Sequence, residues 1–134
     1  MKRTVKRKIG DIGEEVVCKY LEKRGYTIAG RNYLKPWSEI DIIANKGDLL
    51  VFVEVKSVTR EPLVGGGGEV SREMFKPEDN MHPAKLKRLH RAVQTYLLDH
   101  KVPESRPWQI DLACVYLDFK SRKAKVELYE NLIL

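Results

Sequence analysis

The sequence has little of what several classes of functional site require. It contains two cysteines, Cys18 and Cys114, which stand far apart and outside any Cys-x-x-Cys or Cys/His cluster. This spacing excludes a disulfide framework, and buried free thiols are expected instead. The three histidines, His82, His90 and His100, have no partners at metal-ligand spacing, so a zinc site has little support.

Long hydrophobic runs are also missing. No stretch approaches the roughly 18 apolar residues that span a bilayer, and the basic N-terminus is not followed by an apolar signal segment. No predicted helix combines a strong apolar face with a long basic one, which disfavours a peripheral membrane protein. We therefore expect a cytoplasmic protein with no membrane partner.

Positive charge is in modest excess and is unevenly distributed. The formal net charge is +6, which favours an anionic partner such as nucleic acid. Each basic cluster, taken alone, fits a solvated tail or helix face as well as it fits a phosphate-binding surface. The first cluster contains Lys2, Arg3, Lys6, Arg7 and Lys8, and the second contains Lys85, Lys87, Arg88 and Arg91. Lys6, Arg7 and the second cluster are the expected nucleic-acid-binding residues.

Hydrophobic periodicity predicts two helices and five strands. Apolar residues recur every three or four positions over 4–24 and again over 83–97, where Pro83 stands at the expected helix start. Strand patterns occupy residues 26–34, 39–44, 49–58, 109–117 and 125–129. The order α-β-β-β-α-β-β, without internal repeats, predicts a single domain over 1–134 with an α/β or α+β sheet flanked by helices.

Two connecting segments have clear turn or loop composition. The cluster Asn45-Lys46-Gly47-Asp48 joins the second and third strands and predicts a hairpin. Residues 59–82 have no apolar period and contain two prolines and the run Gly65 to Gly68. We expect this segment to be a long mobile loop.

The two hairpin strands carry charged residues in apolar surroundings. Glu39 and Asp41 are two apart and should share a face, with Ile40 and Ile42 on the other. Glu54 and Lys56 share a face in the same way and follow the continuous apolar run 49–53. Such a run indicates a strand covered on both sides, where charges are rarely tolerated without partners.

The expected strand pairing brings these acids together. If Asn45 pairs with Asp48, Glu39 lies opposite Glu54 and Asp41 lies on the diagonal. Lys56 alone cannot balance three carboxylates, so a divalent cation such as Mg²⁺ or Mn²⁺ is expected among these oxygen ligands. Ordinary surface charges on a hairpin are the alternative.

Glu14 adds a fourth acidic residue, at the edge of the apolar stripe of the first helix. Gly10 and Gly13 beside it permit a close backbone approach. A capping or salt-bridging role at the surface is the alternative for this residue.

The order of these motifs is similar to that of a known family. The matching segments are Gly10-x-x-Gly13-Glu14, Gly25-Tyr26, Asn32, Glu39-Ile40-Asp41-x-Ile43-Ala44 and Phe52-Val53-Glu54-Val55-Lys56. They resemble the YraN-like family, predicted nucleases of the PD-(D/E)XK superfamily. The resemblance is close through residue 58 and looser over 85–97 and 109–111. It departs from the family at Ser38, where glycine is usual, and in the glycine-rich loop.

The resemblance implies an α/β restriction-endonuclease-like core with a mixed central sheet. It also implies a metal-dependent endonuclease that hydrolyses phosphodiester bonds in structured or branched DNA, similar to archaeal Holliday junction resolvases. Asp41, Glu54 and the Val55 carbonyl would hold Mg²⁺ or Mn²⁺, and Lys56 would orient or deprotonate the attacking water. Glu14 and Glu39 would be outer-shell or second-metal groups.

Several alternatives stay open at this stage. The basic residues would position the duplex through its phosphates without reading sequence. Trp37, beside the acidic strand, could stack on a base, although a core or rim position is more usual for tryptophan. A nucleic-acid-binding module without turnover, acting in a repair or recombination assembly, is the competing function. The residues alone do not distinguish DNA from RNA or a monomer from a homodimer.

Overall fold

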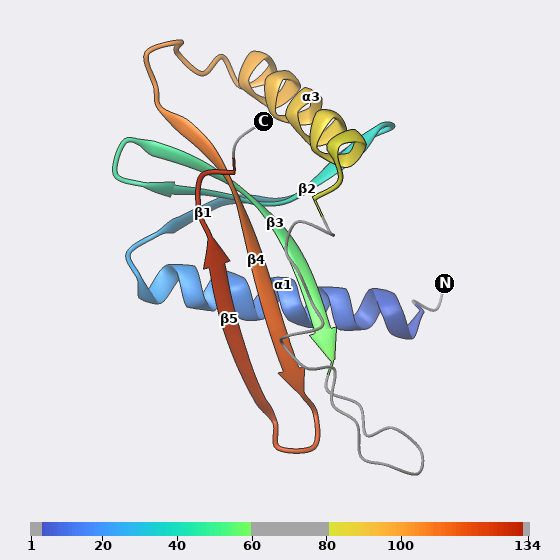
Figure 1. Ribbon diagram of the computed structural model, residues 1–134. Helices are drawn as coiled ribbons and strands as arrows, with labels where there is room; N and C mark the ends of the chain where they lie inside the picture. The colour runs from blue at the N-terminus through green and yellow to red at the C-terminus, as the bar shows by residue number, and fades with distance from the viewer. Residues whose placement is uncertain (1–3, 60–80, 133–134) are drawn as a thin grey trace.

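A five-stranded sheet with a helix on each face forms the framework of the computed structural model, which describes residues 4–59 and 81–132 (Figure 1). The predicted order α-β-β-β-α-β-β is confirmed, and every predicted boundary lies within two residues of the observed one. The elements are α1 (Val5–Lys23), β1 (Thr27–Lys35), β2 (Ser38–Lys46), β3 (Leu49–Thr59), α3 (Pro83–Asp99), β4 (Trp108–Asp118) and β5 (Lys123–Tyr129).

The sheet is mixed. Its strand order is β1-β2-β3-β4-β5, and all neighbours are antiparallel except β3 and β4. A parallel pair needs a crossover connection, and α3 lies in this one. The arrangement is α/β and consistent with the restriction-endonuclease-like core. Of the predicted mobile loop, Thr59 ends β3, Met81 and His82 precede α3, and residues 60–80 lie outside the described residues.

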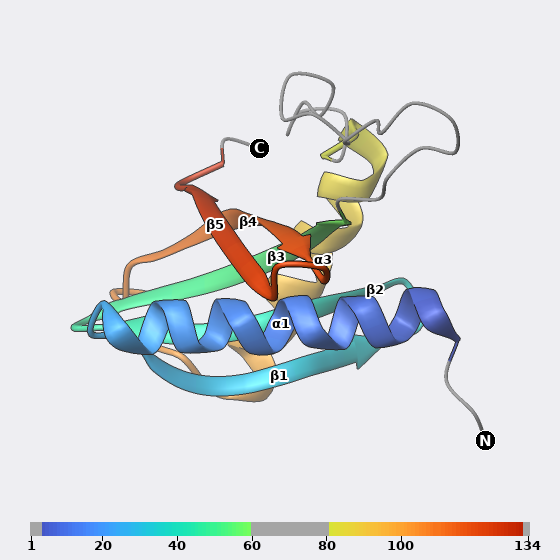
Figure 2. The same cartoon turned by 90° about the horizontal axis from the view of Figure 1, so that it is seen from below.

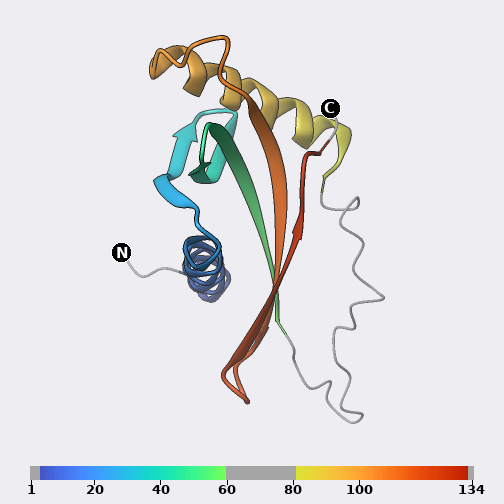
Figure 3. The same ribbon diagram turned by 90° about the vertical axis from the view of Figure 1, so that its left-hand side faces the viewer.

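Alternating residues of β3 cover the two faces of the sheet. Val51 and Val53 pack with α1 residues in one core cluster, whereas Leu50 and Phe52 pack with α3 residues in another. Figures 2 and 3 show α1 lying along one face, and in Figure 3 α3 crosses the upper end of the strands. Neither described helix has an apolar stretch long enough to cross a membrane.

Local signals fix the ends of α1. The Thr4 hydroxyl accepts a hydrogen bond from the Arg7 amide at 3.1 Å and so caps the N-terminus. At the other end Gly25 adopts φ +88°, and the Tyr26 amide donates back to the Leu21 carbonyl. A glycine in this conformation commonly ends a helix.

Gly13 lets α1 approach β3 closely. A Cβ atom added at Gly13 would overlap the Ser57 hydroxyl and lie 3.2 Å from Ser57 Cβ, whereas one added at Gly10 meets nothing within 4 Å. We expect Gly13→Ala to lower the free energy of unfolding by about 1–3 kcal/mol through overpacking. The matched control Gly10→Ala should raise it by up to about 1 kcal/mol through helix propensity. Urea denaturation would measure both, and equal effects would contradict the close approach.

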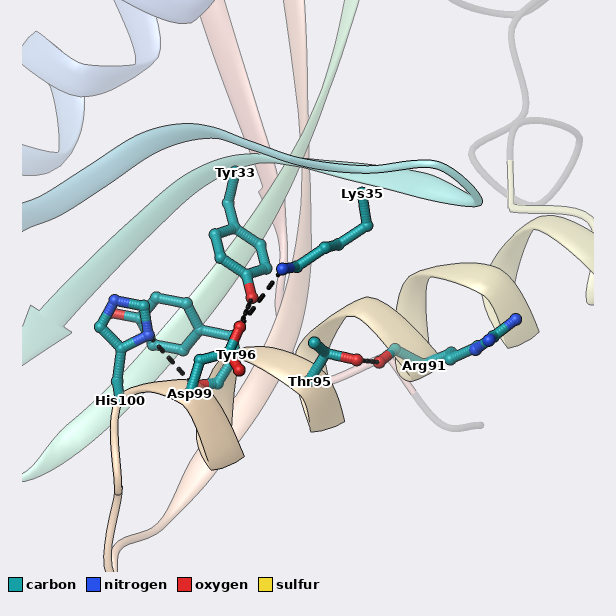
Figure 4. A network of polar contacts seen from close by, with 7 residues as sticks. All are labelled: Tyr33, Lys35, Arg91, Thr95, Tyr96, Asp99 and His100. Carbon is teal, nitrogen blue, oxygen red and sulfur yellow. Dashed lines mark hydrogen bonds and ion pairs between the residues drawn. The ribbon is translucent and has the colours of Figure 1, made fainter.

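A polar and aromatic clamp joins β1 to the C-terminal half of α3 (Figure 4). The Tyr33 hydroxyl donates to Asp99 Oδ2 at 2.7 Å, and Lys35 Nζ lies 3.3 Å from the same oxygen. The Tyr33 ring also packs edge-on against the Tyr96 ring, with 5.2 Å between the ring centroids. These contacts fix the position of β1 relative to α3.

The hairpin between β2 and β3 corrects the predicted register. Asn45 pairs with Leu50, not with Asp48, and Lys46 pairs with Leu49. The loop therefore consists of Gly47 and Asp48, with Gly47 at φ +59° in the first loop position. A two-residue type II′ turn places glycine there, which explains the choice of loop. Glu39 is consequently not opposite Glu54.

A second correction concerns the faces of β2. Ile40 packs in the cluster on the α3 side and Ile42 in the cluster on the α1 side, so the two do not share a face. On β1, Asn32 has φ +53° and lies between residues that pair with Ile42 and with Ile40. A residue in this left-handed conformation breaks the regular alternation of a strand. Asp41 therefore lies where both strands change face.

Candidate functional site

The side chain of Asp41 continues the contact between β2 and β3 where their backbone pairing stops. The last backbone pair is Ile42 with Val53. Beyond it, Asp41 Oδ2 accepts a hydrogen bond from the Val55 amide at 2.8 Å. After burial, the charge of the neighbouring Glu54 carboxyl group is the largest cause that raises the pKa of Asp41. The two strand acids therefore meet at the end of the ladder.

Two further carboxylates approach Asp41 from α1 and β2. Oxygen atoms of Glu14, Glu39 and Asp41 all lie within 4.8 Å of one another, and these three residues could hold a metal ion. With its amide oriented to satisfy both acids, Asn32 donates to Glu39 Oε1 at 2.7 Å and to Glu14 Oε1 at 2.9 Å. The kink at Asn32 thus both displaces Asp41 and supplies a hydrogen-bond donor to its neighbours.

Basic side chains from both helices neutralise part of this charge. Lys85 Nζ of α3 lies 3.1 Å from Glu54 Oε1, and Glu54 is only 8% exposed. Arg7 of α1 lies 3.5 Å from Glu39 Oε1. A buried carboxylate is tolerated only with such partners. The sequence suggested a phosphate-binding role for Lys85 and Arg7, and the structure adds a direct contact with the acids.

Burial and mutual repulsion raise the pKa values of the acids. Burial, followed by the charges of Asp41 and Glu39, raises the pKa of Glu14 to about 7. Burial is also the main cause that raises the pKa values of Asp41 and Glu54, and the Lys85 ammonium opposes the rise at Glu54. The anionic form of the cluster is therefore unfavourable in the protein alone, and a cation would stabilise it.

Two pockets adjoin these carboxylates. The larger, of about 720 Å³, lies between the N-terminal turns of α1 and the end of β3, which are side by side in Figure 1. The smaller, of about 260 Å³, lies beside the β1–β2 turn and α3. Both are lined by Asp41, Glu54 and Lys85. The carboxylates are accordingly reachable by a molecule larger than a metal ion.

The structure gathers most of the residues that the sequence indicated. Glu14, Asp41, Glu54 and Lys56 line the larger pocket, together with Lys6, Arg7 and Val55. Arg88 lines the smaller pocket, and Arg91 lies 3.9 Å over the ring of Trp37. Lys87 is exposed and lines neither of these pockets. Glu39 belongs to the acidic cluster with Glu14 and Asp41, and it lines the smaller pocket with Asp41 and Glu54.

Sequence reasoning missed two features of this site. Asn32 belonged to the recognised motifs without an assigned role, and its hydrogen bonds to Glu14 and Glu39 depend on a backbone kink. The Lys85–Glu54 ion pair joins residues far apart in the chain. The one sequence feature related to this ion pair was the basic start of the second predicted helix. For Val55, the structure shows its amide held by Asp41, and the role predicted for its carbonyl stays a prediction.

Comparison with known proteins gives consistent matches over most of the chain. The model of "Uncharacterised protein family UPF0102" matches residues 13–115. A UPF0102 protein of Chloroflexus aurantiacus is 32% identical over 130 residues, which cover 97% of this chain and 93% of that protein. One of Dictyoglomus thermophilum is 35% identical over 127 residues, covering 95% of each.

A search of solved structures found Pyrococcus furiosus SfsA in complex with Ca²⁺. The match has 19% sequence identity and a TM-score of 0.41, and it covers 94% of this chain and 64% of that one.

Proposed function

The chain belongs to the UPF0102 family, and from its partly buried carboxylate cluster we propose that it is a metal-dependent nuclease hydrolysing phosphodiester bonds in nucleic acid. The observation that carries the proposal is the convergence of Glu14, Asp41 and Glu54 beside Lys56 in one pocket of about 720 Å³. These three acids come from α1, β2 and β3, and their negative charges repel one another. Such an arrangement suits a function that uses a cation.

The donor set fits Mg²⁺ or Mn²⁺. Carboxylate oxygens are the ligands that these cations prefer, and burial followed by mutual repulsion raises the pKa values of Glu14 and Asp41, which a bound cation would oppose. Asp41, Glu54 and the Val55 carbonyl are the proposed ligands, with Glu14 and Glu39 as outer or second-metal groups. A bound cation would supply Lewis-acid stabilisation of charge developing on the phosphate.

The remaining chemistry is assigned to side chains of this chain. Lys56 lines the pocket with the acids and would orient the attacking water. The water oxygen would bond to phosphorus as the bond from phosphorus to the 3′ oxygen breaks. The water loses a proton and the leaving 3′ oxygen gains one, so the products are a 5′ phosphate and a 3′ hydroxyl. Lys6 and Arg7 line the same pocket and would hold neighbouring phosphates.

The finer parts of the proposal follow from the resemblance. We propose branched or otherwise structured DNA as the substrate, and residues 1–134 as one nuclease-like unit. The cytoplasmic location and a homodimeric form stay predictions. Incubation of the purified protein with linear and branched DNA and RNA, with Mg²⁺, Mn²⁺ or EDTA, tests the function directly. Absence of metal-dependent cleavage across this set would overturn it.

One observation favours the alternative of a binding module without turnover. Lys85 and Arg7 already neutralise Glu54 and Glu39 through ion pairs within the protein. In a binding module these pairs would be permanent, and the acids would only hold the helices on the sheet. Metal-dependent cleavage separates the two functions.

The basic start of α3 should contribute electrostatically to nucleic-acid binding. Arg88 lines the smaller pocket, and Lys87 is exposed on the same helix. We expect alanine substitution of either to weaken binding of all sequences alike. The slope of log affinity against log salt should flatten by about 0.9 for each duplex phosphate that the protein no longer neutralises. Salt titrations by fluorescence anisotropy would measure this, and an unchanged slope would mean that α3 faces away from the substrate.

A further inference from the structure

The smaller pocket has the composition of a recess for one nucleotide. Its volume is about 260 Å³, and Trp37 and Arg88 line it beyond the acids. It shares Asp41, Glu54 and Lys85 with the larger pocket. Any group bound in it therefore lies directly beside the proposed cleavage site.

Trp37 is held in place at this pocket. It follows Lys35 and Pro36 in the β1–β2 turn, and the Arg91 guanidinium of α3 lies 3.9 Å from its ring centroid. The clamp of Lys35 and Tyr33 on Asp99 fixes β1 against the same helix (Figure 4). A ring positioned in advance loses little freedom when a ligand stacks on it. Its indole nitrogen also has no hydrogen-bond partner within the part of the chain that the structure describes.

The smaller pocket is lined by two cations as well as by Glu39, Asp41 and Glu54, and this charged lining suits a nucleotide rather than an apolar ligand. Lys85 and Arg88 lie in the first turns of α3, where the helix dipole is positive and no acidic residue is present. Proteins that bind unpaired nucleic acid combine an aromatic ring for the base with cations for the phosphates. Trp37 and Arg88 supply this pair from two different walls of one recess, the β1–β2 turn and the helix.

The size of the pocket limits what can enter. Small-ligand pockets range from about 300 to 1,000 Å³, so this one, at about 260 Å³, falls just below the range and has room for a single base but not for a base pair. We propose that it binds one unpaired nucleotide beside the scissile phosphate. The preferred substrate is then nucleic acid with unpaired nucleotides at the cut, such as a flap or branch, rather than continuous duplex. This inference rests on the proposed nuclease function and specifies its substrate class.

The two tryptophans of the chain allow a direct test. In the Trp108→Phe variant, Trp37 is the only tryptophan, so it alone gives the tryptophan fluorescence. The Trp37→Phe variant keeps only Trp108, which packs against the core with its ring centroid 6.0 Å from that of Phe52. In EDTA, which prevents cleavage, a flapped DNA oligonucleotide should quench the Trp37 signal in a saturable way. A blunt duplex of the same length should leave it unchanged, and Trp108 should respond to neither.

Affinity provides a second readout in the otherwise intact chain. Trp37→Ala should weaken binding of the flapped oligonucleotide by about 5- to 150-fold, the range expected for loss of one stacked base, and Trp37→Phe by much less. Binding of the blunt duplex should stay nearly constant. Equal losses for both, or a silent Trp37 while the flap binds, would overturn the inference and leave the nuclease proposal intact. Quenching without any metal-dependent cleavage would instead overturn the proposed function alone.

Discussion

Asp41→Asn, Glu54→Gln and Lys56→Ala should each reduce metal-dependent cleavage by at least about 10²-fold, because each removes a ligand or a charged group beside the scissile phosphate. Nucleic-acid binding measured in EDTA should be retained, since without metal it relies on Lys6, Arg7 and the start of α3. Single-turnover cleavage assays and anisotropy titrations on the same preparations would separate the two effects.

Glu15→Gln is a matched control for this series. Glu15 follows Glu14 on α1, but it is exposed and pairs with Arg31 at 2.7 Å, outside the acidic cluster. Its loss should leave cleavage at the wild-type rate, whereas Glu14→Gln should lower it. Wild-type turnover in any of the Asp41, Glu54 or Lys56 variants would refute the assignment of the active site.

Asp41→Asn should also raise the melting temperature of the metal-free protein. The substitution keeps an oxygen that accepts from the Val55 amide, at present 2.8 Å away, and it removes one of several repelling charges. Relief of unfavourable charge of this kind commonly gains about 0.5–2 kcal/mol. For a domain of this size, we expect the melting temperature to rise by roughly 2–8 °C. Destabilisation would instead mean that the carboxylate is a satisfied structural group.

The stabilisation that Asp41→Asn gives the metal-free protein should increase with pH. Folding raises the pKa of Glu14 from its usual 4.5 to about 7 and raises that of Asp41 as well. A raised carboxyl pKa means that the folded state binds more protons, so stability declines as pH rises between the unfolded and folded values. The advantage of Asp41→Asn should therefore be larger at pH 8 than at pH 5. Thermal melts in EDTA at both values would measure it.

Added metal should stabilise the wild type much more than the Asp41→Asn variant. Added Mn²⁺ stabilises a folded state that binds it by about 2.7 kcal/mol at a hundredfold excess over Kd. The wild type should show this stabilisation, and Asp41→Asn should lose most of it. Equal stabilisation of both proteins would exclude Asp41 as a ligand.

The fold could be predicted from the sequence because its signals are local. The apolar period of α1 and α3 and the composition of the strands defined every described element. The sequence specified the register of the β2–β3 hairpin less clearly than it specified the helices and strands. Four turn-forming residues, 45–48, permit more than one loop, and the φ of +59° at Gly47 shows which one forms. The error was a shift of two residues, which does not change the face of β3 on which Glu54 lies.

The sequence predicted which residues form the site, but it did not predict the contacts between them. Glu54, Lys56 and Asp41 could be recognised as charges in apolar strands. Their arrangement depends on the kink opposite Asn32 and on α1 packing closely at Gly13, and neither follows from strand alternation. The ion pair between Lys85 and Glu54 depends on where α3 docks, which only tertiary structure determines.

That ion pair has a consequence for how the two ligands bind. Lys85 lies 3.1 Å from Glu54 and cannot fully neutralise both that carboxylate and a substrate phosphate. In the proposed function, a cation that takes over Glu54 releases the ammonium for phosphate. A phosphate that draws Lys85 away likewise leaves Glu54 free for the cation. Metal and nucleic acid should thus bind with positive cooperativity, and thermodynamic reciprocity requires each to strengthen the other by the same factor. The site would then assemble fully only when both ligands are present together.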